Sequence, residues 1–72
     1  MGYEQTTKEA PMYKFVKANH RQGYVEVARR HFDEDEAIEI ARSVVPEGWA
    51  TDTGAELIDG IYWLVPAYVE AN

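Results

Sequence analysis

The residues that could do chemistry in this chain are carboxylates, two histidines and a serine, because cysteine is absent. Residues 33–36 (DEDE) are hard ligands for calcium or magnesium, but the loop glycine and the ligand spacing of an EF-hand are missing. Ser43 has no base at a recognisable spacing, and His20 and His31 lie in or beside predicted loops. We therefore expect no catalytic site, no metal or other cofactor, and no small-molecule substrate.

Acidic and basic residues are segregated along the chain. Residues 1–31 carry six basic and three acidic groups, whereas residues 32–72 carry ten acidic groups and one arginine, and the whole chain has a net charge of -6. Such a surface repels nucleic acid over most of its area and attracts basic surfaces. The pattern predicts a positively charged partner protein, although acidic surfaces also simply keep small proteins soluble.

The carboxylates expected to contact this partner lie in a predicted helix and in the segment that follows it. They are Asp33, Glu34, Asp35, Glu36 and Glu39, joined by Glu47, Asp52 and Glu56. An array of carboxylates can occupy a basic groove and imitate the phosphates of DNA. Trp63, beside Ile58 and Ile61, could add an aromatic anchor, and core packing explains it equally well.

A second hypothesis is a nucleic-acid-binding surface on a basic hairpin near the N-terminus. Its cations are Lys14, Lys17, Arg21, Arg29 and Arg30. Tyr13, Phe15 and Tyr24 lie between them and could stack on bases. The negative charge of the remaining chain opposes this use, and lysines at a sheet edge also discourage the addition of foreign strands.

Two hairpins and one helix must position these residues. Alternating apolar residues over 12–19 and 24–29 predict a first hairpin with a link at 20–23. Asp33 as N-cap with Glu36 three residues later predicts the start of a helix, and Pro46 its end. Its apolar side contains Ala37, Ile38, Ile40, Ala41, Val44 and Val45.

Residues 49–53 and 55–58 predict one further strand with a bulge at Gly54. A two-residue turn at 59–60 would pair it with residues 61–65, with Ile58 opposite Ile61 and Glu56 opposite Trp63. Pro66 indicates a sheet edge or the end of pairing. The predicted fold class is α+β, an antiparallel sheet of two β-hairpins with one helix packed on one face, in the order β-β-α-β-β.

At 72 residues, the chain has room for one small domain. We expect a flexible N-terminal lead-in over residues 1–11 and a single domain over 12–72. Its apolar stretches are too short to cross a membrane, its N-terminus lacks a signal-peptide pattern, and the absence of cysteine suits a cytoplasmic location. Both a monomer and a homodimer, formed through an apolar face around Trp63, remain open.

The predicted helix and its exit resemble a known family. Residues 35–41 (DEAIEIA), followed by residues 45–49 (VPEGW) and preceded by a hairpin, are similar to small early proteins with which some short-tailed phages shut off host bacterial RNA polymerase. The resemblance covers residues 24–50. It implies a sheet with one helix and an acidic surface that binds the jaw of the polymerase's largest subunit, and this surface would comprise Asp33, Glu34, Asp35, Glu36 and Glu39.

That family also relies on arginines in the strand after the turn, where residues 50–56 contain Asp52 and Glu56 and no basic residue. Anti-CRISPR inhibitors are similar to the chain in size and composition only. We therefore expect a phage-type inhibitor in the host cytoplasm that binds RNA polymerase. The alternatives are an anti-CRISPR protein that blocks the DNA-binding groove of a CRISPR effector by acidic mimicry, and a nucleic-acid-binding module that uses the first hairpin.

Overall fold

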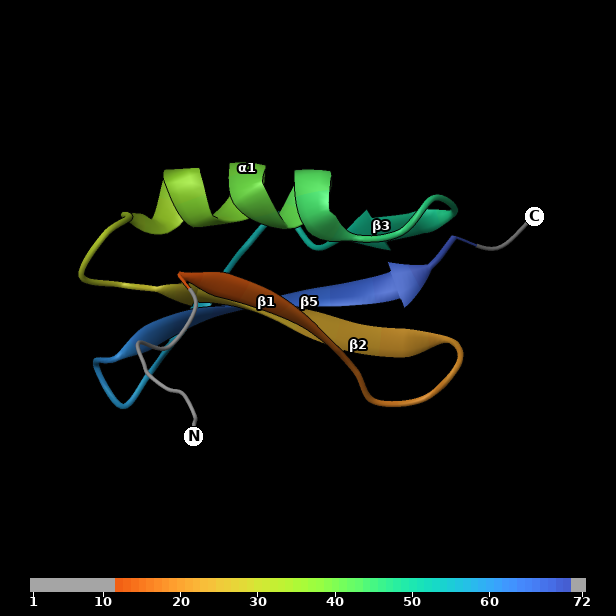
Figure 1. Cartoon of the computed structure of the whole chain (residues 1–72), viewed down its shortest axis with the longest axis horizontal. Coiled ribbons are helices and arrows are strands. Elements are labelled where there is room, and N and C mark those ends of the chain that lie inside the picture. Colours follow the sequence, from red (N-terminus) through yellow and green to blue (C-terminus); the bar gives the residue numbers. More distant parts are fainter. Residues whose placement is uncertain (1–11, 71–72) are drawn as a thin grey trace, which may run out of the picture.

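A computed structural model describes residues 12–70, in which one helix lies over one face of a five-stranded antiparallel sheet (Figure 1). The elements are β1 (Tyr13–Lys17), β2 (Gln22–Ala28), α1 (Glu34–Val44), β3 (Trp49–Thr51), β4 (Glu56–Ile58) and β5 (Tyr62–Val69). The strand order is β1-β2-β5-β3, and β4 also pairs with β5. The predicted fold class is confirmed. The predicted lead-in over residues 1–11 lies outside the described residues.

The first hairpin turns two residues earlier than predicted. The side-chain oxygen of Asn19 accepts hydrogen bonds from the backbone N–H groups of Arg21 (2.8 Å) and Gln22 (2.9 Å), which closes the turn before Gly23. Gly23 is therefore paired within β2, opposite Lys17. A Cβ atom at this position would collide with the backbone oxygen of Val16, so the close approach of the two strands requires glycine here.

The helix begins and ends where the sequence predicts. Asp33 accepts a hydrogen bond from the Glu36 N–H, and Glu36 accepts one from the Asp33 N–H, both at 3.0 Å, which forms a capping box. The helix ends at Val44, with Val45 as its C-cap in an extended conformation immediately before Pro46.

Small side chains hold α1 close to the sheet. Ala37 and Ala41, one helical turn apart, are fully buried. They pack in one cluster with Val25 and Val27 of β2 and Val65 of β5. Beside this cluster, the rings of Phe15 and Trp49 meet edge to face, with centroids 5.1 Å apart. The core thus lies between α1 and the two central strands.

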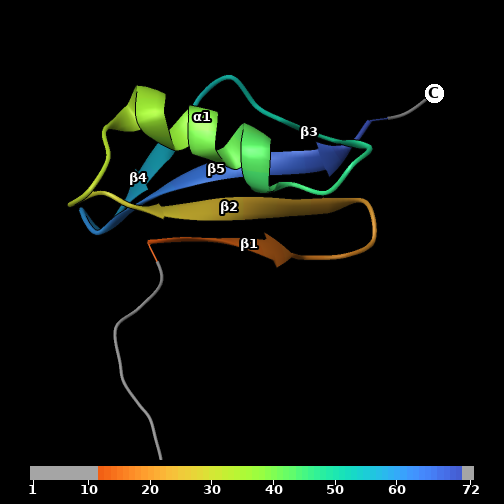
Figure 2. The ribbon, with the colours of Figure 1, turned by 45° about the horizontal axis from the view of Figure 1, so that its top comes forward.

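The last three strands differ from the prediction. In place of one strand with a bulge, β3 and β4 are separate strands that pair with the same side of β5 and are joined by residues 52–55 (Figure 2). Pro66 lies within β5, opposite Tyr24 of β2, so the prediction that it marks a sheet edge is wrong, whereas the pairing of β5 with β3 does end beside it, at Ala67. The carbonyl of Pro66 accepts a hydrogen bond from the Asp52 N–H at 2.9 Å. Because the N and C=O of a strand residue face the same neighbour, the missing N–H of Pro66 points to the place where β3 ends.

The turn between β4 and β5 has the predicted chemistry but a different register. Asp59 and Gly60 have φ angles of 55° and 68°, and the Ile61 N–H donates to the Ile58 carbonyl at 2.9 Å, as in a type I′ turn. Ile58 nevertheless pairs with Tyr62, which leaves Ile61 as an extra residue.

This extra residue turns the side chains of β5 to the face opposite to the predicted one. The predicted pairs Ile58–Ile61 and Glu56–Trp63 are wrong, since Trp63 lies opposite Leu57 and Glu56 lies opposite Leu64.

No helix of the described residues is long and apolar enough to cross a membrane.

Candidate protein-binding surface

Three of the predicted contact acids also hold the structure together. Asp33 and Glu36 form the capping box at the start of α1. Glu34 accepts a hydrogen bond from the backbone N–H of Ala55 at 3.4 Å, which links the start of the helix to the segment between β3 and β4. Their exposed carboxylates add negative charge to this end of the molecule, and their main contacts are internal.

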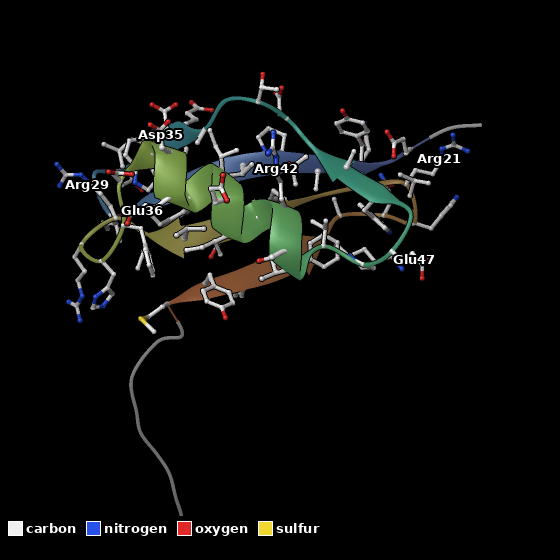
Figure 3. All side chains as sticks on the ribbon, turned by 90° about the horizontal axis from the view of Figure 1, so that it is seen from above. Arg21, Arg29, Asp35, Glu36, Arg42 and Glu47 are labelled. Atoms are coloured by element: carbon white, nitrogen blue, oxygen red, sulfur yellow. The ribbon has the colours of Figure 1, made fainter. Side chains whose placement is uncertain are left out.

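Asp35 and Glu39 are different, because both are exposed and neither forms a hydrogen bond or an ion pair within residues 12–70. They lie one turn apart on α1 and line a shallow cleft between the helix and Thr53. Arg42 lies further along the same cleft (Figure 3). Positions four apart share one side of a helix, so the two carboxylates can contact one partner together.

Asp52 extends this negative region beyond the helix. It is exposed, it directly precedes Thr53 of the cleft, and one of its oxygens accepts the Thr53 N–H at 2.8 Å. Four exposed residues together form a negative surface, which we call the acidic helix surface. They are Asp35, Glu36, Glu39 and Asp52.

The remaining predicted acids lie elsewhere. Glu56 of β4 lies opposite Leu64 of β5. It faces away from the helix, because the neighbouring pair of Leu57 and Trp63 lies on the helix side. Glu47 follows the other end of α1, far from Asp35 (Figure 3). The structure therefore brings together only part of the predicted acidic set.

Trp63 is half-buried and packs against the core, and it does not lie beside Ile58 and Ile61 as the prediction requires. Its indole N–H donates to the backbone oxygen of Phe32 at 3.0 Å. This contact fixes the ring and uses its polar group. The most exposed apolar side chain near the turn between β4 and β5 is Ile61, at 66%.

The basic residues of the nucleic-acid hypothesis do not form one patch. Arg21 and Arg29 lie at opposite ends of the molecule (Figure 3), separated by the length of β2, which is about 20 Å for its seven residues. Arg30 follows Arg29, Lys17 lies on the helix side opposite Gly23, and Lys14 lies 3.8 Å from the carboxylate of Glu26 on the other face. A nucleic-acid strand would therefore not meet these five cations as one continuous patch.

The sequence reasoning missed the second face of the sheet. Tyr24, Tyr62 and Tyr68 lie on the face opposite the helix, as does Leu64, because they alternate with the buried residues of β2 and β5. The alternation within residues 62–69 was the available signal. Desolvation on this face raises the pKa of the Tyr62 phenol, and the negative charges of Glu26, Tyr24 and Asp59 raise it further.

The fold and the surface together define a small α+β protein with an exposed acidic helix. Within the described residues, no group of three or more potential ligands could hold a metal ion. A scan against protein-family models finds no matching family, and searches of curated proteins and of solved structures find no match either.

Proposed function

We propose that this protein is a non-enzymatic binding protein whose acidic helix surface contacts a basic surface on a nucleic-acid-handling protein complex. The observation that carries the proposal is the exposure of Asp35 and Glu39, one turn apart and without a partner within the described chain. Uncompensated carboxylates held on a rigid helix lose little freedom when a partner's arginines or lysines bind them.

Long-range attraction supports the same proposal. All ten acidic side chains in residues 33–70 are exposed, and Arg42 is the one basic residue in that range. Such a field speeds encounter with a basic groove and aligns the acidic side toward it. Carboxylates seated in a groove that normally holds phosphates would exclude the nucleic acid, so binding would inhibit the partner.

Bacterial RNA polymerase is the first proposed partner, because residues 24–50 resemble phage proteins that inhibit it. Residues 50–56 contain Asp52 and Glu56 and no arginine, so any docking here would depend on carboxylates. A CRISPR effector is the alternative partner, blocked by the same acidic mimicry.

The test measures binding to purified bacterial RNA polymerase and inhibition of promoter-dependent transcription. The full chain is compared with the double variant Asp35→Lys/Glu39→Lys, which keeps the capping box of Asp33 and Glu36 intact. The control is Glu47→Lys/Glu70→Lys, which makes the same change in net charge at the other end of the molecule, where the Glu70 N–H bonds to the Gly48 carbonyl.

We expect the wild type and the control to bind and inhibit, and the helix variant to bind at least about tenfold more weakly. Equal binding by the two double variants would exclude the acidic helix surface as the contact. Failure of the wild type to bind polymerase would exclude that partner, and the same three proteins would then be tested for inhibition of DNA binding by a CRISPR effector.

A further inference from the structure

The face of the sheet opposite α1 is unusually apolar for a sheet face without a covering element. We call this face the open sheet face. Its large apolar and aromatic side chains are Val16, Tyr24, Ile58, Tyr62, Leu64 and Tyr68. The helix lies on the other face, and no described helix or strand covers this one (Figure 1). A solvated face of an antiparallel sheet normally carries polar residues at alternate positions, so this composition indicates a docking surface.

One row of residues crosses the whole open sheet face and has opposite charges at its two ends. Lys14 of β1 pairs with Glu26 of β2, Glu26 with Leu64 of β5, and Leu64 with Glu56 of β4. Lys14 and Glu56 are both exposed. The positive end lies at one sheet edge and the negative end at the other.

We propose that the open sheet face is the interface of a homodimer, in which a second copy of this chain packs its own open sheet face against it. The two-fold axis of this dimer lies between the two sheets, midway between β2 and β5, and runs parallel to the strands. Rotation about it reverses the order of the strands and keeps the position of each residue along its strand. The strand β1 of each copy then faces β4 of the other, and β2 faces β5. The rotation therefore places Lys14 of each copy opposite Glu56 of the other.

In two of the four rows that β2 and β5 share on this face, the same rotation also matches a large side chain with a small one. Tyr24 and Pro66 occupy one row, so Tyr24 of each copy meets Pro66 of the other. Ala28 and Tyr62 occupy another row and meet in the same way. Two sheets packed face to face at about 10 Å need this alternation of large and small residues.

A second copy fits this face better than a nucleic acid does, because Glu26 and Glu56 lie on it and the chain carries a net charge of -6. From the strand spacing and rise, four strands of about seven residues give roughly 400 Å² per copy. Two copies would together bury roughly 800 Å², which is below the roughly 1,000 Å² of stable specific interfaces and is the size of a weak, transient contact. The dimer is therefore one that dissociates on dilution.

The test is sedimentation equilibrium of the full chain over a range of concentrations, with two single variants, Lys14→Glu and Glu56→Lys. Each variant alone places two like-charged pairs across the interface, so we expect its dimer dissociation constant to rise by at least about tenfold. In an equimolar mixture, both pairs of the mixed dimer have opposite charges again. We expect the mixture to dimerise like the wild type.

Two controls reverse charges on the helix side of the sheet. Lys17→Glu and Glu39→Lys make the same changes in charge, and we expect both to dimerise like the wild type. Circular dichroism of each variant confirms that it is folded. The proposal is overturned by a wild type that stays monomeric at all concentrations, by a mixture that does not recover dimerisation, or by controls that dissociate like the test variants. The acidic helix surface lies on the opposite side, so this result is independent of partner binding.

Discussion

The hydroxyl of Thr51 is buried without a hydrogen-bond partner within the described chain, where it lies on β3 opposite Ala67. A buried polar group without a partner lowers the stability of the folded state. We expect Thr51→Val to raise the free energy of unfolding by about 1 kcal/mol, because it replaces the hydroxyl with a methyl group of similar size. Urea denaturation measures this change.

Thr53→Val is the matched control for this prediction. Thr53 is exposed in the segment between β3 and β4, so this substitution should change the free energy of unfolding of the protein by less than about 0.5 kcal/mol. A loss of stability in Thr51→Val would show that the hydroxyl of Thr51 has a hydrogen-bond partner such as a bound water molecule.

Tyr62 gives the chain a pH-dependent stability at high pH. Its phenol pKa is raised above 10.0 by desolvation first and by Glu26, Tyr24 and Asp59 after it. The unfolded chain therefore loses this proton at a lower pH than the native chain does, and stability falls as pH rises from the unfolded toward the folded pKa. We expect Tyr62→Phe to reduce this fall, as measured by denaturation across that range.

Glu26→Gln tests the electrostatic part of the same effect. Removal of the carboxylate should lower the pKa of Tyr62, because one of the negative charges that oppose its ionisation is gone. The ultraviolet absorbance of tyrosinate, taken as the difference from the same protein carrying Tyr62→Phe, follows this titration. An unchanged or higher midpoint would show that Glu26 does not act on Tyr62.

The start of α1 depends on the capping box. Asp33→Ala removes the acceptor of the Glu36 N–H, and we expect it to lower the free energy of unfolding by about 1 kcal/mol. Asp35→Ala removes an acid from the same turn that bonds no N–H within the described chain, so its loss should be about 0.3 kcal/mol. Thermal and urea denaturation compare the two variants, and equal losses would mean that the dipole effect dominates the cap.

The helix was predictable because its signals are local. The capping residues, the apolar side with Ala37 and Ala41, and Pro46 all lie within one short segment, and each agrees with the others. The first hairpin was predictable in kind, but its turn is decided by hydrogen bonds to Asn19, which alternation does not reveal.

The second hairpin was not predictable in register, because residues 62–69 are apolar on both faces. A strand with one polar face has only one register that buries its apolar side, and this strand has two. The extra residue Ile61 selects the register that places Val65 and Ala67 under the helix and Tyr62 and Leu64 on the open sheet face. Small side chains fit beneath Ala37 and Ala41, whereas tyrosines would push the helix away.

The difference between signals that are local in sequence and pairing between distant strands also explains how much of the candidate surface was predictable. Asp35 and Glu39 are recognised from their spacing on a helix, which is a local property. The environment of Glu56 and the position of Trp63 depend on the register of β4 and β5. A shift of one residue moved Trp63 to the helix side and separated it from Glu56, which stays on the open sheet face. The basic residues are close in sequence, but β2 separates Arg21 from Arg29.

The two proposed surfaces lie on opposite sides of the sheet. A dimer through the open sheet face would leave both acidic helix surfaces pointing outward, away from the two-fold axis. Such a dimer could bind two sites on one partner, or two partner molecules, with a gain in avidity over the single chain. Sedimentation of the dimer with an excess of partner would distinguish these arrangements by mass.

The distribution of charge can be tested without any partner, by anion-exchange chromatography at a mildly alkaline pH. The double variants Asp35→Lys/Glu39→Lys and Glu47→Lys/Glu70→Lys each reduce the net charge from -6 to -2. Retention depends on the densest negative patch that can face the resin, in addition to the net charge. The first variant removes the centre of that patch, whereas the second removes charges from the end that carries Arg21 (Figure 3). We expect the helix variant to elute at the lower salt concentration, and elution at the same concentration would show that net charge alone governs how this protein meets a basic surface.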